Sequence, residues 1–264
     1  MKRLNFHKNI DSTDHIILKE LESLIQRHLP PVPQITMYTN GVQFAGDTII
    51  GLNLNQCGLT VLPESFGEMT SLKFLNLDSN QLTALPESFG QLQSLQTLIL
   101  RYNQLTELPE SFGGLTSLTF LDLHSNQLTV LPESFGQLAS LQKLNLGFNQ
   151  LTELPESFGG LKSLQDLSLY HNKLKILPNS FGKLTSLQEL LLQNNRLSVL
   201  PESFTQFSKL FKFSISDNPL GKDSWTILNA VIKKNFLYRI GTCFFSNRCR
   251  RVLYWDGREY EIPF

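Results

Sequence analysis

The residues of this chain whose types and spacing could do chemistry are its histidines, carboxylates and cysteines. His124 and His171 stand near Asp122 and Asp166, and imidazole with carboxylate is a ligand set that can bind zinc. The two histidines fall two periods apart in a repeating pattern and in neighbouring columns, which places their Cα atoms about 10 Å apart. Joint ligation would need converging rotamers and a third ligand. We therefore expect no metal site and no cofactor.

Three cysteines offer a second kind of chemistry. Cys57 lies far from Cys243 and Cys249 in the sequence, and the odd number leaves at least one thiol unpaired. A Cys243–Cys249 disulfide stays open as an alternative to three reduced thiols in a reducing compartment. The chain contains no G-x-x-x-x-G-K-[ST], G-x-S-x-G or H-E-x-x-H motif. The sequence therefore predicts that the protein is not an enzyme.

The composition excludes several classes of partner. In 264 residues, 23 Lys+Arg balance 23 Asp+Glu, so no net field attracts nucleic acid or an anionic membrane. Charged residues make up 17%, below the roughly 25% that is usual for soluble domains. No apolar run approaches the ~18 residues that cross a bilayer, and the first residues show no signal-peptide core. We expect a soluble, cytoplasmic protein that does not enter a membrane.

The elements that position these residues follow from a repeat of 23 residues that begins at residue 49. Each unit reads L-x-x-L-x-L-x-x-N-x-L-T-x-L-P-E-S-F-G-x-L-x-S. The units open at Ile49, Leu72, Leu95, Leu118, Leu141, Leu164, Leu187 and Leu210. An asparagine column runs through Asn80, Asn103, Asn126, Asn149, Asn172, Asn195 and Asn218, with Cys57 in the first slot. A phenylalanine column runs through Phe66, Phe89, Phe112, Phe135, Phe158, Phe181 and Phe204.

The unit predicts one strand and one tight turn per repeat. In L-x-x-L-x-L the last two leucines alternate with an outward residue, which is strand periodicity. A unit this short cannot bury its own apolar face, so neighbours must stack and share one core, with parallel strands about 4.8 Å apart. The asparagine amides are expected to bond backbone groups where the strands turn.

The Pro-Glu-Ser segment predicts the turn on the opposite side. Proline suits the first position of a short helical turn, and the following glutamate places a carboxylate near the positive end of that turn. The glutamate column is Glu64, Glu87, Glu110, Glu133, Glu156 and Glu202, and Asn179 interrupts it. We expect a structural role for this column, with an acidic binding strip as the alternative.

These residues resemble the leucine-rich repeat family, and the resemblance covers residues 49 to about 220. It implies an α/β solenoid, or horseshoe, with a concave parallel β-sheet, short turns or 3₁₀ segments on the convex side, and terminal caps. The Leu-Pro-Glu-Ser-Phe-Gly segment is most similar to the intracellular class found in small-GTPase-associated and prokaryotic proteins. The resemblance implies scaffolding or signalling, with small GTPases as one class of partner.

Both ends of an open solenoid need caps. For residues 1–48 we expect a helix after Ser12-Thr13-Asp14 and a hairpin that turns at Asn40-Gly41. About eight repeats fill residues 49–220. For residues 221–264 we expect a helix from Trp225 to Phe236, with Asp223 or Ser224 as its N-cap, and a hairpin that turns at Asp256-Gly257.

The C-terminal segment supports a second function. Arg248, Arg250 and Arg251 stand close to aromatic residues, and this combination can bind single-stranded nucleic acid through phosphate contacts and stacking. The aromatic residues are Phe244, Phe245, Tyr254 and Trp255. We favour a cap that seals the last repeat, and nucleic-acid binding stays an alternative.

The outward residues of the strands differ from unit to unit, whereas the scaffold columns are nearly uniform. Drift or fitting to a ligand could produce this difference. Aromatic residues and arginine gather in the middle units, and these types are enriched in protein–protein hot spots. The residues that we predict to bind a partner are Phe74, Ile99, Arg101, Tyr102, Phe120, Asp122, His124, Lys143, Phe148, Asp166, Tyr170, His171 and Glu189. Because these include both signs of charge, we expect the partner to present mixed charges.

The function that we expect is a non-enzymatic protein–protein interaction module. Its concave face would hold side chains at fixed spacing, which lowers the ordering cost of association, and would supply the roughly 800 Å² that a standard interface takes from each partner. A secreted or surface adhesin is a further alternative, which predicts a signal peptide and cysteine-rich caps. The oligomeric state stays open, because a hairpin edge could pair with a second copy.

Overall fold

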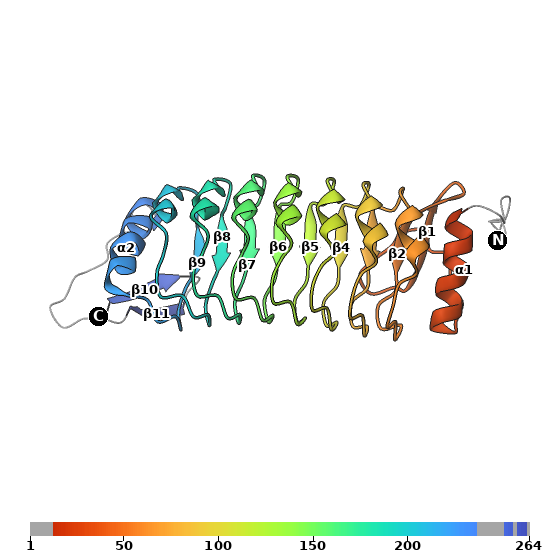
Figure 1. Ribbon diagram of the computed structural model, residues 1–264, viewed down its shortest axis with the longest axis horizontal. Helices are drawn as coiled ribbons and strands as arrows, with labels where there is room; N and C mark the ends of the chain where they lie inside the picture. The colour runs from red at the N-terminus through yellow and green to blue at the C-terminus, as the bar shows by residue number, and fades with distance from the viewer. Residues whose placement is uncertain (1–12, 237–250, 256–257, 263–264) are drawn as a thin grey trace.

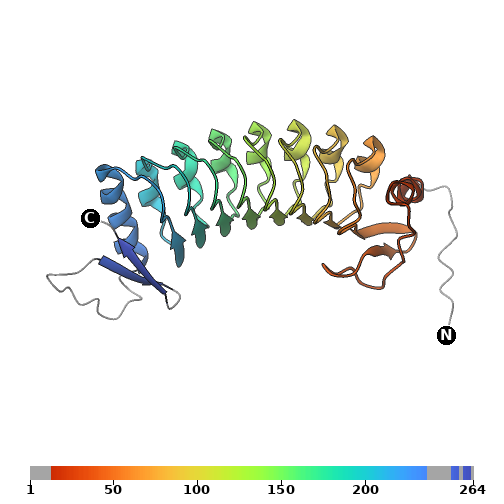
Figure 2. The same ribbon diagram turned by 90° about the horizontal axis from the view of Figure 1, so that it is seen from below.

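The computed structural model describes residues 13–236, 251–255 and 258–262. Nine strands form one open sheet in chain order, and Figure 1 shows the repeats following one another from helix α1 to helix α2. Figure 2 shows that the array is arched, with the strands on the inner side and the helical turns on the outer side. The expected horseshoe with a concave parallel sheet is therefore confirmed.

The strands are as short as the sequence pattern indicated. From β3 to β9 each has three residues, and the middle residue is a leucine or phenylalanine between two outward-facing neighbours. The parallel register pairs equivalent positions of adjacent repeats, as in Phe74 with Thr97 and Leu75 with Leu98. The bounds are β2 Thr48–Asn53, β3 Phe74–Asn76, β4 Thr97–Ile99, β5 Phe120–Asp122, β6 Lys143–Asn145, β7 Asp166–Ser168, β8 Glu189–Leu191 and β9 Lys212–Ser214.

Seven 3₁₀ turns form the convex side. They are Glu64–Glu68, Glu87–Gln91, Glu110–Gly114, Glu133–Gln137, Glu156–Gly160, Asn179–Lys183 and Glu202–Gln206. The prediction that proline takes the first position of each turn is wrong by one residue. Pro63 precedes its turn in an extended conformation, and its carbonyl accepts a 2.9 Å hydrogen bond from the Phe66 N–H. Proline suits that place because the missing N–H is not needed there.

The core between sheet and turns is a stack of identical side chains. Neighbouring phenylalanine rings from Phe66 to Phe204 are nearly parallel, with centroids 6.0 to 6.3 Å apart. The next residue in most units is glycine, and a Cβ at Gly90 would overlap the carbonyl oxygen of Ser111 in the next turn. The last turn has Thr205 at this position and faces α2 instead of another turn. The repeats therefore stack as closely as their backbones allow.

The asparagine column fastens each repeat to the previous one, as predicted. Asn80 Nδ2 donates to the carbonyls of Leu54 and Leu77, both at 2.9 Å, and Asn80 Oδ1 accepts the N–H of Leu59 at 2.9 Å. The same pattern recurs along the array, and these amides are buried. Each amide thus satisfies backbone groups that the strand ends would otherwise bury unpaired.

The N-terminal hairpin differs from the prediction. Helix α1 spans Thr13–Ile25, and strand β1, Gly41–Ala45, pairs antiparallel with β2. The hairpin therefore turns at residues 46–47, and the prediction of a turn at Asn40-Gly41 is wrong. Asn40 instead donates to the Asn55 carbonyl at 2.6 Å. The segment before the loop meets the other edge of β1 in parallel, because the Val42 N–H donates to the Pro30 carbonyl at 2.9 Å, so no antiparallel hairpin forms there.

The C-terminal elements match the prediction more closely. Helix α2 spans Lys222–Phe236, and strands β10, Arg251–Trp255, and β11, Arg258–Ile262, form a separate antiparallel pair. The helix begins at Lys222, so Asp223 and Ser224 lie inside it and neither is its N-cap. The buried hydroxyl of Ser224 instead accepts the N–H of Leu200 at 3.0 Å. Within the residues that the structure describes, no helix combines the length and the hydropathy that a membrane span requires.

Candidate functional site

A left-handed residue follows each parallel strand on the concave side. The φ angles in this column are Gln56 53°, Ser79 56°, Tyr102 49°, Ser125 55°, Phe148 54°, His171 53°, Asn194 58° and Asp217 55°. The conformation lets the N–H reach the next repeat, as when the Tyr102 N–H donates to the His124 carbonyl at 3.0 Å. The left-handed conformation costs more free energy for bulky side chains than for Asn, Asp or Gly. Of the three aromatic residues in the column, Tyr102 and Phe148 therefore occupy it at an energetic cost, whereas His171 tolerates the conformation better.

These three residues belong to one aromatic cluster, formed by Tyr102, His124, Phe148, Tyr170 and His171. The His124 ring makes edge contacts with Tyr102 and Phe148, with centroids 5.5 and 5.2 Å apart. Phe148 in turn stacks on His171 at 4.3 Å and meets the edge of Tyr170 at 5.4 Å. The structure thus brings together five of the predicted residues across four successive repeats.

The cluster is open to solvent although it is largely apolar. Tyr102 is 51% exposed and Phe148 is 47% exposed. Gly147 makes room for it, because a Cβ there would lie 2.6 Å from the Tyr170 ring. A glycine in the column that holds Arg101, His124 and Tyr170 in other repeats was the sequence signal for this packing. Exposed aromatic surface of this kind is typical of interaction sites.

Electrostatics keep the centre of the cluster uncharged. Burial lowers the pKa of His124 below its ordinary value, and the nearby Arg101 guanidinium lowers it further, against the opposing effect of Asp78. Arg101 itself pairs with Asp78 at 3.1 Å and lies 5.3 Å from the Tyr102 ring centroid. Burial raises the pKa of the Tyr170 hydroxyl, whose oxygen lies 3.4 Å from His124 Nδ1. The shifts of His124 and Tyr170 therefore both favour the neutral forms of these two rings.

Two predicted contact residues are buried, and the prediction for them is wrong. Ile99 is 1% exposed and Asp122 is 8% exposed. Both lie between buried leucines on three-residue strands, where the neighbouring outward side chains pair directly with them and leave little room for solvent. Asp122 instead supports the cluster, because its carboxylate accepts the backbone N–H of His124 at 3.0 Å. Burial raises the pKa of this carboxyl group, and that hydrogen bond opposes the shift.

The remaining predicted residues share one outward column, which changes character along the array. Phe74 and Phe120 are partly exposed on β3 and β5, one column away from the aromatic cluster. Further along, Lys143 pairs with Asp166 at 2.6 Å and Lys212 pairs with Glu189 at 2.9 Å. The hydrogen bond that Lys143 donates to Asp166 raises the pKa of Lys143. These charges satisfy one another within the face, and the expectation that the partner presents mixed charges stays a prediction.

A loop that the sequence pattern did not predict lies on the concave side of the first repeats. Residues 31–40 descend from α1 on that side in Figure 2. Asn53 Nδ2 donates to the Thr36 carbonyl at 2.6 Å, and Asn76 Nδ2 donates to the Met37 carbonyl at 3.2 Å. The loop is non-periodic and its contacts are distant in sequence, so no sequence pattern indicated it, and the structure shows that its Tyr38 is exposed.

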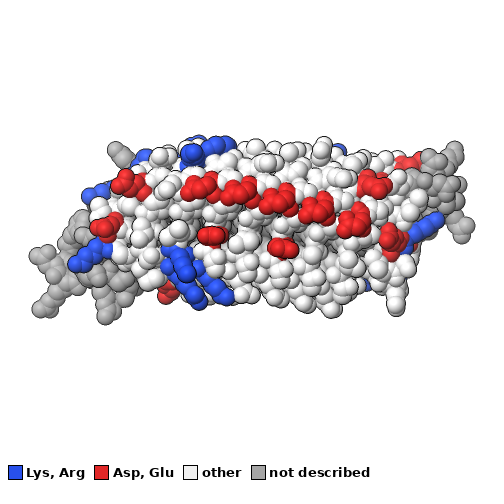
Figure 3. Space-filling model, viewed as in Figure 1, with Lys and Arg blue, Asp and Glu red and all other residues white. Residues whose placement is uncertain are grey.

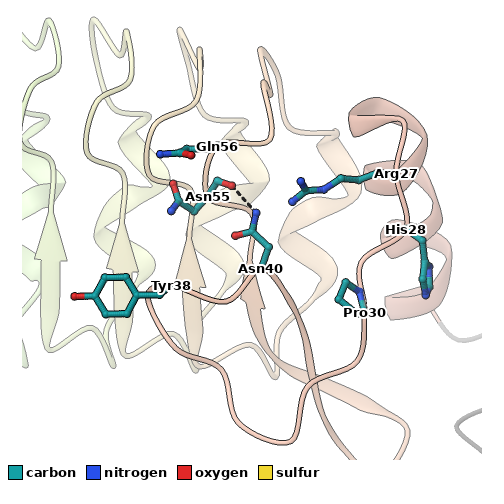
Figure 4. A pocket seen from close by; sticks show the side chains of 7 residues that line it. All are labelled: Arg27, His28, Pro30, Tyr38, Asn40, Asn55 and Gln56. Atoms are coloured by element: carbon teal, nitrogen blue, oxygen red, sulfur yellow. Dashed lines mark hydrogen bonds between the residues drawn. The ribbon is translucent and has the colours of Figure 1, made fainter.

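An open cavity of about 510 Å³ lies between this loop, α1 and the first repeat. Figure 4 shows Arg27, Asn40 and Asn55 among its lining residues. Beside it, Arg27 Nη2 lies 3.3 Å from the sulfur of Cys57, whose pKa is raised by burial and lowered in part by Arg27. A thiol with a raised pKa is a weak nucleophile, so the cavity does not contain an activated cysteine.

The glutamates of the convex side form the straight row of carboxylates that Figure 3 shows across the molecule. At Glu156 the role is structural, because its carboxylate accepts the backbone N–H groups of Asn179 and Ser180 at 3.0 and 3.1 Å. Against the raising effect of burial, these bonds lower the pKa of Glu156. This residue therefore supports the first interpretation of the column.

The structure offers no support for the remaining sites considered from the sequence, which are a metal site, a C-terminal disulfide and a basic aromatic segment. Among the described residues, no three His, Cys, Asp or Glu side chains gather in a way that could hold a metal ion. Most of the C-terminal residues considered from the sequence lie outside the described residues, namely Cys243, Phe244, Phe245, Arg248, Cys249 and Arg250. The side chains of Arg251, Tyr254 and Trp255 are not described either. The basic aromatic segment therefore stays a prediction from sequence.

Three family models match the repeats. One described as leucine-rich repeat region matches residues 51–150, and two described as leucine-rich repeat match residues 140–161 and 154–197. Together they run without a gap over more than half of the chain. No curated protein matches the sequence.

Solved structures show the same architecture. A crystal structure of PEPR1-AtPEP1 is 31% identical with a TM-score of 0.68, and the match covers 79% of this chain and 32% of that one. A leucine-rich repeat protein of Leptospira interrogans is 34% identical with a TM-score of 0.53, over 70% and 53% of the two chains. The ectodomain of the Arabidopsis receptor kinase HAESA, in complex with the peptide hormone ligand IDA, is 27% identical with a TM-score of 0.64, over 79% and 38%. This chain thus spans about a third to a half of the proteins that it matches.

Proposed function

Because the chain belongs to the leucine-rich repeat family, we propose that it is a non-catalytic module that binds a protein partner through the aromatic cluster of its concave face. The single observation that carries the proposal is the set of three aromatic residues in left-handed conformations. The same column contains Ser, Asn, Asp and Gln elsewhere, so the scaffold does not need aromatic side chains there. Retaining them at a cost is typical of functional sites.

The mechanism that we propose is pre-organisation. The three left-handed aromatic residues each have their N–H bonded to the next repeat, and the rings contact one another before any partner arrives. Little side-chain entropy is then lost on binding, so more of the apolar burial contributes to affinity. Exposed Tyr and Phe side chains are typical anchors of such interfaces.

The proposed binding surface could act in either of two places, inside the cell or at the cell surface. We propose intracellular scaffolding or signalling, supported by the similarity of the Leu-Pro-Glu-Ser-Phe-Gly unit to the intracellular class, which includes small-GTPase-associated proteins. Recognition of a peptide at the cell surface is supported by the solved structures whose titles describe receptor ectodomains with peptide hormones. Antibody labelling of intact and permeabilised source cells distinguishes the two. Labelling of intact cells would contradict the intracellular version.

The binding proposal is tested with replacements that suit the backbone. Tyr102→Asn, Phe148→Asn and His171→Asn together remove the exposed rings but keep a residue type that tolerates positive φ. Affinity capture from the source cells should retain a protein on wild type and lose it on the triple variant. Calorimetry with the purified captured protein then gives the affinities.

Asp217→Asn is the matched control, because Asp217 occupies the same left-handed column at the far end of the array. It should bind as wild type does. Equal capture by wild type and the triple variant would contradict the proposal.

A further inference from the structure

We propose that Tyr38, at the tip of the loop of residues 31–40, is a further partner-binding residue, and that the binding surface runs from this loop to the aromatic cluster. The inference rests on the proposed function and extends it. Its occupant is an extended polypeptide segment that is rich in apolar side chains and carries no net charge.

The loop is built into the concave face. The buried side chains of Asn53 and Asn76 donate to two successive carbonyls, those of Thr36 and Met37. The loop is also fixed at its base, where the Val32 N–H donates to the Val42 carbonyl at 2.8 Å. The first two parallel strands are therefore covered by the chain itself, and the open concave surface begins at the tip of the loop.

The tip holds its side chains in place and leaves them in water. The hydroxyls of Thr36 and Thr39 lie 3.1 Å apart, and the Tyr38 N–H donates to the Thr36 hydroxyl at 3.4 Å. Tyr38 is nevertheless 91% exposed and Met37 is 42% exposed. Tyr38 lines the outer end of the cavity, and in Figure 4 its ring extends along the array toward the later repeats. An ordered tip that presents an aromatic ring toward the open surface has the geometry of an anchor.

The loop also indicates the chemistry of the occupant. The loop reaches the strands and turns back at residues 37–38, where Thr36 and Thr39 form an antiparallel bridge, and the concave asparagines bind its main-chain carbonyls. A partner segment that lies across the next strands, beyond this turn, reaches Tyr102 within a strand or two, at about 4.8 Å per strand. The concave charges pair internally, as Arg101 does with Asp78 and Lys143 with Asp166, so a charged segment gains little there.

A random linear peptide library supplies the probe. Peptides enriched on the immobilised full chain are synthesised, and their dissociation constants are measured by fluorescence anisotropy. Tyr38→Ala should weaken binding about tenfold without lowering the melting temperature. Ile176→Ala is the control, because Ile176 is a large apolar residue that is 56% exposed and lies outside the strands of the concave sheet. It should leave the affinity unchanged.

The outcomes separate this inference from the proposed function. Peptides that lose affinity with Tyr102→Asn but not with Tyr38→Ala would overturn the inference and leave the function standing. Peptides that respond to neither change, or no enrichment at all, would contradict both. Sedimentation of the unliganded chain completes the test. A wild-type dimer that Tyr38→Ala dissociates would assign the surface to a second copy and overturn the peptide occupant.

Discussion

The ring of Phe148 lies flat on the ring of His171, 4.3 Å between centroids, and both side chains leave the backbone from left-handed residues. Stacking of this kind contributes about 0.5–1.5 kcal/mol, and the left-handed conformation costs roughly 1–2 kcal/mol for each residue. The conformational cost of Phe148 alone matches or exceeds the stacking energy of the whole pair. The pair is therefore held in place by the scaffold, and it adds little to the stability of the scaffold.

Phe148→Asn should accordingly change the free energy of unfolding by no more than about 1 kcal/mol, because lost stacking offsets relieved backbone strain. Urea unfolding followed by circular dichroism measures the change. Leu98→Ala, at a fully buried core position, is the comparison and should lose about 2–5 kcal/mol. A loss of that size for Phe148→Asn would show that the ring is part of the core.

Stability should fall as the pH falls below the ordinary His124 pKa of 6.5. Because burial and Arg101 lower the pKa of folded His124, the unfolded chain binds a proton that the folded chain resists. The loss therefore begins near that value and levels off below the folded pKa. The raised pKa of Asp122 acts in the opposite direction, at lower pH.

Melting temperatures measured between about pH 5 and pH 8 test this prediction, with an NMR titration of the His124 ring as the direct reading. His124→Gln is the control and should flatten the dependence. An NMR pKa of 6.5 or above would contradict the prediction.

Gly90→Ala should destabilise the chain by about 1–3 kcal/mol, since the new methyl group meets the Ser111 carbonyl of the next turn. Thr205→Ala is the matched change in the last turn, where a larger residue is already present, and should cost under about 0.5 kcal/mol. Thermal unfolding of the two variants checks the contrast. Equal losses would mean that the turns are not packed backbone against backbone.

Affinity for the partner should depend only weakly on salt. Lys143 pairs with Asp166, Lys212 with Glu189 and Arg101 with Asp78, so binding releases few counter-ions. Calorimetry at 50 and 200 mM salt should differ by less than about threefold, whereas a nucleic-acid contact through several phosphates loses at least 10³ over that range. A steep slope would favour the basic C-terminal segment over the concave face.

The features that recur with the 23-residue repeat could be predicted from the sequence. The strand positions, the buried leucines and the asparagine bonds all follow from the 23-residue period, and so does the neighbourhood of Tyr102, Phe148 and His171. A period assigns a face to each residue but does not say what covers it. Ile99 faces the concave side by its spacing and is buried all the same.

The end segments had no such period to follow. Asn40-Gly41 is a strong local hairpin signal, yet the strand that follows it pairs antiparallel with β2 and meets the segment before it only through the parallel bridge between Pro31 and Val42. The loop contact between Thr36 and Asn53 joins residues that no pattern relates. At this end of the chain, pairing of β1 with β2 decided where the hairpin turns, and the local turn preference of Asn40-Gly41 did not.

The phenylalanine stack sets the shape of the partner that this face can accept. Its rings are spaced 6.0 to 6.3 Å apart, whereas parallel strands are spaced about 4.8 Å apart. Two layers with a fixed difference in pitch must bend toward the shorter one, so the ratio of the two spacings and the distance between the layers set the radius of the arch. Because the turns already meet backbone to backbone, a larger residue at positions such as Gly90 would widen the outer spacing and tighten the arch, with no change in any residue that a partner touches.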